Sequence, residues 1–259
     1  MGTIGGHDRL STLIQLREKT DIQVEPKWIL SVVASYILWI VYAIIFFTRS
    51  ELAPFNLDQT LGLVGTLAFA ASTGLSFLVY NLMSRENKHA EREQEIAREV
   101  LNRIQSGTSP DRMAVLLPLS SVEQDFANLL QKSRGHSAIL WALLVLIPYA
   151  GWALLIVALY LLTQSSNSHG KLETLLFEDL DRTLLATGSQ HMSLVNHPSS
   201  PRNSLAFALA SFATFGIVAF SWLYVTIIGE RAHFSYHSNL EPELLRVLSA
   251  SGLPPGRLS

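Results

Sequence analysis

Residues 61–83 decide the fold: they read LGLVGTLAFAASTGLSFLVYNLM, without one Asp, Glu, Lys, Arg or His. An α-helix rises about 1.5 Å per residue, so about 20 apolar residues cross the roughly 30 Å of hydrocarbon in a bilayer. Three further windows are comparably long and free of charge: 28–47, 138–163 and 205–228. We therefore expect an all-α integral membrane protein with four transmembrane helices.

The composition of the 259-residue chain agrees with a membrane protein. Charged residues make up 15 % of the chain, against roughly 25 % in an ordinary soluble domain, which argues against a soluble enzyme. The net charge of −2 provides no basic patch for nucleic acid. Because the chain has no Cys, disulfide scaffolds and Cys-ligated clusters are excluded.

The distribution of Lys and Arg indicates which connections face the cytoplasm, where these residues are enriched. They concentrate in the two terminal segments and in residues 84–137. We expect a multi-pass protein of the cell membrane with both termini in the cytoplasm. Its parts would be a cytoplasmic N-terminal arm (1–27), a transmembrane hairpin (28–83, with spans 28–47 and 61–83), a helical cytoplasmic connection (84–137), a third span (138–163), a connection (164–204), a fourth span (205–228) and a C-terminal tail (229–259).

The third window carries a possible break. Pro148-Tyr149-Ala150-Gly151 lies near its middle, and Pro interrupts the hydrogen bonds of a helix. The ordinary interpretation is one tilted, proline-kinked span. The alternative is a re-entrant hairpin that turns at Pro148–Gly151 and returns to the face it entered from, with its backbone covered by protein or water.

An internal repeat follows spans two, three and four. In each copy a Tyr precedes a His by nine positions: Tyr80 and His89, Tyr160 and His169, Tyr224 and His233. Apolar residues then recur every four positions on one helical face, at Ile96, Val100 and Ile104, at Leu176, Leu180 and Leu184, and at Leu240, Leu244 and Leu248. The pattern predicts an amphipathic interfacial helix after each span. Since successive single spans are antiparallel, however, the second unit would face the opposite compartment.

Each repeated His is followed four residues later by a second possible metal ligand. The pairs are His89 with Glu93, His169 with Glu173, and His233 with His237. Residues at i and i+4 share a helix face, so each pair can offer two ligands to zinc or a similar cation. A pair is half a site, and antiparallel spans would keep the pairs apart. The favoured interpretation is that these residues are solvated or cap the interfacial helices, with metal binding as the alternative.

Small residues recur every four positions in the second window, at Gly62, Thr66, Ala70 and Gly74. A ridge of this kind lets another helix approach closely in lipid. It predicts tight packing within the bundle, with formation of a homo-oligomer as the alternative.

The segments Tyr80–Glu93 and Tyr160–Glu173 share the pattern Tyr-x8-His-x3-Glu. It resembles uncharacterised prokaryotic, archaeal-type multi-span membrane proteins in which a span continues into a charged, His- and Glu-rich helix. That resemblance implies membrane residence and no known activity. The third copy departs from it, because His237 stands where Glu is expected.

No catalytic or cofactor-binding motif occurs in the sequence, and no ionisable residue lies inside the four windows. We therefore expect a non-catalytic interaction or assembly module without a cofactor. Its expected partner is the lipid bilayer, with other membrane proteins or copies of itself as further candidates. Nucleic acid is not expected to be a partner. The alternative is a small transporter or channel subunit.

Overall fold

The computed structural model describes residues 9–21, 24–48, 57–107, 113–132, 135–147, 150–193 and 201–253, and these residues form helices without any strand. The helices are α1 (Arg9–Gln15), α2 (Arg17–Thr20), η1 (Pro26–Trp28), α3 (Ile29–Phe47), α4 (Leu57–Gly107), α5 (Met113–Lys132), α6 (Ala138–Leu144), α7 (Ala150–Ala186), α8 (Ser204–Ala213) and α9 (Ile217–Ala250). The all-α prediction is confirmed.

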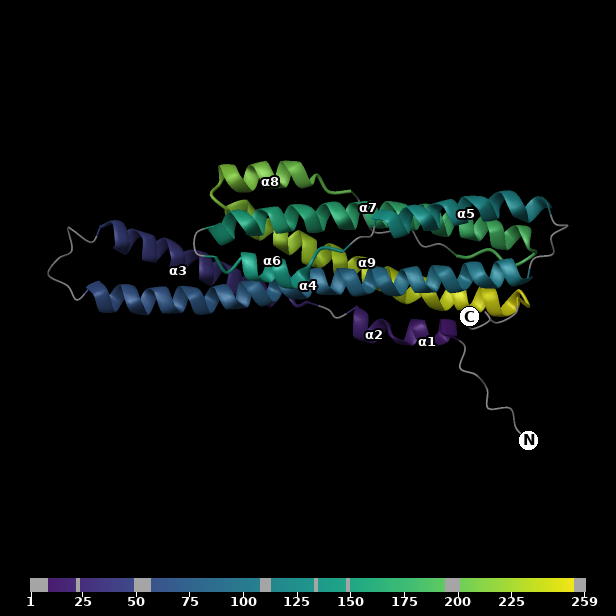
Figure 1. Cartoon of the computed structure of the whole chain (residues 1–259), viewed down its shortest axis with the longest axis horizontal. Helices are drawn as coiled ribbons and strands as arrows, with labels where there is room; N and C mark the ends of the chain where they lie inside the picture. Colours follow the sequence, from purple (N-terminus) through teal and green to yellow (C-terminus); the bar gives the residue numbers. More distant parts are fainter. Residues whose placement is uncertain are drawn as a thin grey trace, which may run out of the picture.

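Three helical hairpins build the molecule: α3–α4, α6–α7 and α8–α9 (Figure 1). In each, an apolar helix leads into a long helix, and the long helices α4, α7 and α9 run in the same direction. Side-chain contacts fix the orientation of α6. Asn87 of α4 donates to the carbonyl of His136 at 2.9 Å, and Ser76 donates to that of Ala142 at 2.7 Å, so α6 runs antiparallel to α4.

The third window is two helices rather than the single kinked helix expected over 138–163. The first, α6, ends at Leu144, and the second, α7, begins at Ala150. Where α7 begins, a Cβ on Gly151 would lie 2.2 Å from the carbonyl oxygen of Val145, so this close return requires Gly. Pro148 and Tyr149 lie outside the described residues. The structure therefore agrees with the hairpin alternative.

The fourth window is also broken, which the sequence analysis did not anticipate. Between α8 and α9, Phe215 has a φ of 49° and Gly216 a φ of 94°, the left-handed region that reverses a chain direction. Tyr36 of α3 donates a hydrogen bond of 2.7 Å to the carbonyl of Phe215 and so holds the turn against the first hairpin. The window 205–228, predicted as the fourth span, therefore contains two helices rather than one.

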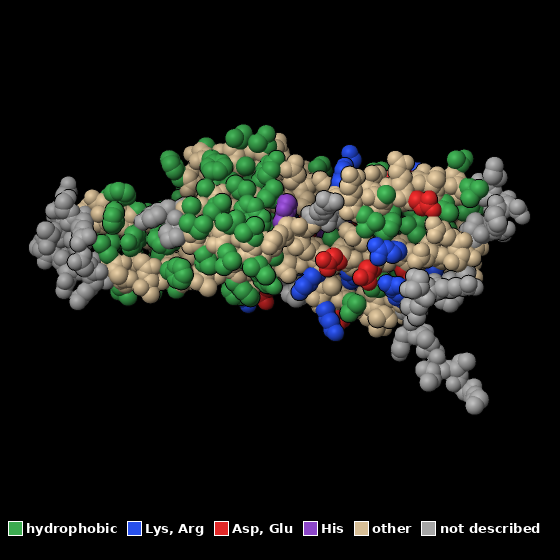
Figure 2. Space-filling model, viewed as in Figure 1, with side chains coloured by type: hydrophobic (Ala, Val, Ile, Leu, Met, Phe, Trp, Pro, Cys, Tyr) green, Lys and Arg blue, Asp and Glu red, His purple; other side chains and the backbone are tan. Residues whose placement is uncertain are grey.

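Two halves of different character result. The apolar half, residues 29–47, 60–83, 138–147, 150–163 and 204–228, contains no charged side chain, and large hydrophobic residues cover its surface (Figure 2). Two helices, Pro26–Phe47 and Thr60–Gly107, are long and apolar enough to cross a membrane, which indicates membrane association. The charged residues gather in the polar half, residues 9–21, 84–107, 113–132, 164–193 and 229–253.

The polar half is held by the repeated apolar stripes. All nine stripe residues predicted from the repeat are buried in one core, together with Leu10, Val122 and Leu129. The amphipathic segments therefore continue α4, α7 and α9 without a break and pack against one another, rather than forming the separate interfacial helices that the repeat predicted. Helices α1 and α5 complete the cover, α1 against α4 and α9, and α5 against α7.

Most of the small-residue ridge is exposed, and not packed within the bundle as the sequence predicted. Gly62, Thr66 and Ala70 are exposed, and a Cβ on Gly62 would meet nothing within 4 Å. Only Gly74 packs closely, since a Cβ there would lie 3.0 Å from the Cβ of Ser31. The predicted packing within the bundle thus holds for Gly74 alone.

Candidate metal centre

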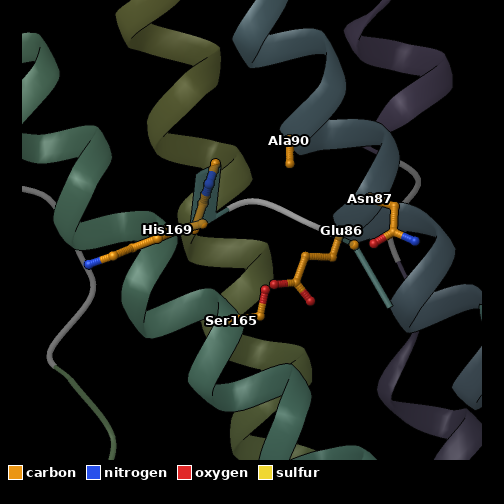
Figure 3. A pocket seen from close by; sticks show the side chains of 7 residues that line it. Glu86, Asn87, Ala90, Ser165 and His169 are labelled. Atoms are coloured by element: carbon orange, nitrogen blue, oxygen red, sulfur yellow. The ribbon is translucent and has the colours of Figure 1, made fainter. Parts of the chain in front are cut away.

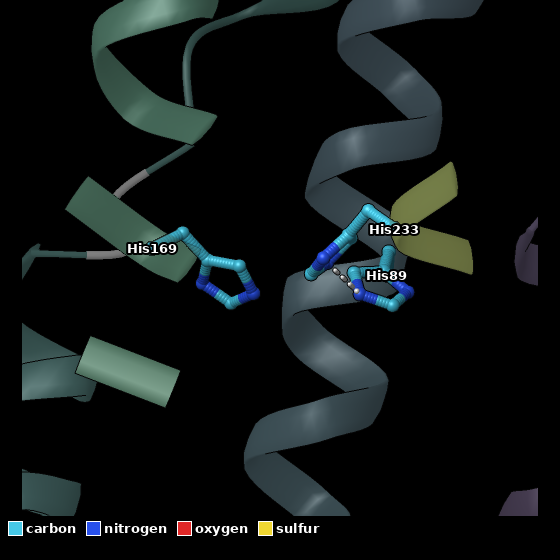
Figure 4. A group of neighbouring side chains, drawn as sticks. All are labelled: His89, His169 and His233. Atoms are coloured by element: carbon cyan, nitrogen blue, oxygen red, sulfur yellow. Dashed lines mark hydrogen bonds between the residues drawn. The ribbon is translucent and has the colours of Figure 1, made fainter. Parts of the chain in front are cut away.

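Three histidines face one another where the long helices pass from the apolar to the polar half. His89 comes from α4, His169 from α7 and His233 from α9 (Figure 4). Nε2 of His89 lies 3.1 Å from Nε2 of His233, and the ring of His169 lies 5.9 Å from that of His89 and 6.0 Å from that of His233. Because the long helices run in the same direction, the shared nine-residue spacing places all three rings at one level.

One helical turn further along, Glu93, Glu173 and His237 form a second level. Nε2 of His237 lies 2.9 Å from Glu173 and 3.9 Å from Glu93. The carboxylates also reach the first level: Glu93 lies 2.5 Å from Nε2 of His169, and Glu173 lies 3.7 Å from Nε2 of His233. The structure therefore brings together all six metal-ligand candidates found in the sequence.

These six side chains are withdrawn from solvent. Glu173 is 0 % exposed, His237 1 %, and even His233, the most open of them, only 14 %. The favoured interpretation from the sequence, that they are solvated or capping groups, is wrong. They lie in the interior of continuous helices, and the parallel long helices remove the topological obstacle to their meeting.

A second layer of charged residues surrounds the cluster. The Asp21 carboxylate contacts Nδ1 of His89 at 3.0 Å and accepts a hydrogen bond of 2.9 Å from Arg92. Arg92 also donates to Glu241 at 2.9 Å, and Glu241 lies 3.6 Å from Nδ1 of His237. This layer was not predicted from the sequence. Arg92 and Glu241 carried a signal, since they follow His89 and His237 by three and four positions on the same helix face; Asp21 carried none.

Without a metal, the carboxylates hold protons on two of the rings. Burial is the largest single influence on His169 and lowers its pKa, but the charge and hydrogen bond of Glu93, together with the charges of Glu173 and Glu86, outweigh burial and raise that pKa to about 9. In the same way burial is the largest influence on His237 and lowers its pKa, but Glu173, Glu241 and Glu93 together raise that pKa well above its ordinary value. Burial lowers the pKa of His233 well below its ordinary value. The metal-free cluster thus pairs two cationic rings with two carboxylates, and a divalent cation can replace those two protons without a change in total charge.

A small polar cavity of about 10 Å³ lies against His169 (Figure 3). Glu86, Asn87 and Ser165 line it, with Ala90, Lys132 and Gly135. This volume suits one water molecule. On the side of the apolar half, Arg85 and Glu230 form a buried ion pair, and the Arg85 guanidinium lies 5.0 Å from the centre of the Phe234 ring. The cluster therefore sits among compensated charges rather than in bare hydrocarbon.

Comparison with family models, with curated proteins and with solved structures finds nothing that matches this chain.

Proposed function

We propose that this chain is a membrane-anchored metal-binding protein that holds a divalent first-row transition-metal ion between its three hairpins. One observation carries the proposal: each hairpin supplies two ligand-type side chains at the same register, and the six lie buried together in groups whose ligand atoms are within 4.8 Å of one another. Imidazole suits zinc, iron, nickel and copper, whereas calcium and magnesium prefer oxygen ligands only.

An ion-pair network without metal is the competing explanation for the cluster. Burying charged groups costs free energy, and a buried ion pair is often no more stable than well-packed apolar residues. A structural ion pair needs only one cationic and one anionic side chain. This interior site contains four imidazoles and two carboxylates. A metal ion compensates the carboxylates directly and gives the imidazole nitrogens a common partner.

The hairpins supply the membrane anchor. Residues 60–83 of α4 extend about 36 Å, long enough to cross the hydrocarbon, whereas residues 150–163 of α7 extend about 21 Å and residues 217–228 of α9 about 18 Å. The first hairpin therefore crosses the membrane twice, and the other two enter and leave through the same face. This topology replaces four crossings with two. It also keeps all three repeats and both termini on one side, the cytoplasmic side by the positive-inside rule.

In this proposal the protein remains non-catalytic. The ion ties the three units into one assembly at the membrane surface, and the polar half is the part that partner proteins can reach.

Metal analysis of the full-length protein, purified in a mild detergent and dialysed, tests the proposal. We expect about one transition-metal ion per chain, and we expect His169→Ala to lose most of it. The matched control is His191→Ala, because His191 is exposed on the segment that follows α7. A wild-type protein that retains no more metal than the His169→Ala variant contradicts the proposal.

A further inference from the structure

The six ligand residues of the cluster are arranged regularly, because each lies close to the same number of others. In four groups of three residues, one ligand atom from each residue lies within 4.8 Å of the other two: His89, His169 and His233; His89, Glu93 and His237; Glu173, His233 and His237; and Glu93, His169 and Glu173. Every residue belongs to two groups and therefore neighbours four of the other five. The pairs that never share a group are His89 with Glu173, His169 with His237, and His233 with Glu93.

The corners of an octahedron are related in the same way, since each of the six neighbours four others and faces one. Each long helix provides two neighbouring corners, one turn apart, and each opposite pair comes from two different helices. Three parallel helices that carry ligands at i and i+4 place three of these residues at each of two levels, one helical turn apart. Six ligand residues at two adjacent levels can therefore surround one ion.

We infer that the cluster is a six-coordinate site for one divalent metal ion, with four imidazole nitrogens and two carboxylate oxygens as ligands. The inference rests on the proposed function and specifies the coordination and the class of ion. Zinc in structural sites is almost always four-coordinate, so the site favours ions that accept six ligands, such as Fe²⁺, Co²⁺ or Ni²⁺. Neighbouring ligands on such an ion are about 3 Å apart for bonds of about 2.1 Å, so the side chains close inward on binding.

The second layer already orients rings of the cage. The Asp21 carboxylate faces Nδ1 of His89 and leaves Nε2 to point inward, where it lies 3.1 Å from Nε2 of His233. Glu241 stands on the Nδ1 side of His237, whose Nε2 faces Glu173. A carboxylate behind a ligating imidazole is the usual second shell of a metal site.

A complete set of six protein ligands has a chemical consequence. Catalytic metal sites keep a position open for water or substrate, and this cage leaves none. The ion therefore binds the three hairpins to one another and does not activate a water molecule.

Cobalt substitution of the full-length protein tests the coordination. The protein in detergent is stripped with a chelator and titrated with Co²⁺, and we expect one ion per chain with the weak visible absorption of six-coordinate cobalt. X-ray absorption should show six nitrogen or oxygen neighbours. The intense bands of tetrahedral cobalt, or two ions per chain, would overturn the inference while metal binding itself stands. Failure to retain any ion would remove the proposed function and the inference together.

Water access to the ion provides a second measurement. Loaded with Mn²⁺, the wild-type protein should show no exchangeable water on the ion by proton relaxation, and Glu173→Ala should gain this signal because one corner becomes free. Glu178→Ala is the matched control, since Glu178 is half-exposed on the same helix. A wild-type protein that already shows an exchangeable water contradicts the complete cage, and this reading does not depend on how the variants fold.

Discussion

Asp21 is the residue whose role the geometry makes easiest to isolate. It joins the N-terminal segment to His89 and to Arg92, and its side chain is only 5 % exposed. Outer-layer partners of metal ligands typically contribute 10–100-fold to affinity. We expect Asp21→Ala to weaken metal binding by about that factor, measured by competition with a chelator of known affinity.

Two variants make the Asp21 result specific. Asp21→Asn keeps an acceptor for Nδ1 of His89, so it should recover part of the lost affinity. Glu18→Gln alters an exposed carboxylate on α2 and should bind as the wild type does. An affinity unchanged in Asp21→Ala would show that His89 needs no orienting partner.

Gly216 gives a second prediction at the scale of one residue. Its φ of 94° suits Gly, and a side chain in the left-handed region costs about 1–2 kcal/mol. Gly216→Ala should therefore lower the free energy of unfolding by about that amount in a denaturant titration. Gly62→Ala is the control, because Gly62 lies in α4 with open space around it. Equal stability of the two variants would argue against the turn between α8 and α9.

At the scale of elements, the shared core of the polar half can be tested with two neighbouring leucines of α7. Leu184 is 0 % exposed and Leu185 is 46 % exposed. Leu184→Ala should cost about 2–5 kcal/mol, as large-to-small changes in a core do, and Leu185→Ala far less. Comparable losses, measured as unfolding free energies in the same detergent, would mean that α7 does not present its stripe to α4 and α9.

The sequence predicted much of this arrangement, and its failures have a physical cause. A charge-free window of over 20 residues has the same composition whether it forms one straight helix or two helices that turn back on each other. Hydropathy alone therefore cannot distinguish a single span from a hairpin. In the sequence, Pro148 indicated a break in the window 138–163. Gly216 is one of 15 glycines, and nothing in the sequence indicated a turn there. The repeat singled out all six residues of the cluster, although the favoured interpretation left them solvated, and it predicted all nine stripe residues of the core. Only the assumption that spans alternate in direction kept the three histidines apart.

At the scale of the whole molecule, the three hairpins predict that all long connections lie on one side of the membrane. The chain has no Cys, so single-Cys variants can be labelled from each side of sealed vesicles. Ser193→Cys, between α7 and α8, and Ser251→Cys, after α9, should react from the same side. Four crossings would place these two positions on opposite sides.

Removing the metal should loosen the molecule as a unit. A ligand present at 100 times its dissociation constant stabilises the folded state by about 2.7 kcal/mol. We expect chelation to lower the thermal midpoint of the wild-type protein and of Glu178→Ala. The thermal midpoint of His169→Ala, which already lacks one ligand, should fall much less on chelation. A midpoint indifferent to the chelator in the wild type would mean that the ion does not tie the hairpins together.

The placement of the ligands along the chain also bears on biosynthesis. His89 and Glu93 emerge first from the ribosome, His169 and Glu173 later, and His233 with His237 only with the α8–α9 hairpin. An ion captured early would have two or four protein ligands and would exchange readily. With six ligands from one chain, full retention would come only when the last pair arrives, so a bound metal would distinguish a chain that includes the α8–α9 hairpin from one that lacks it.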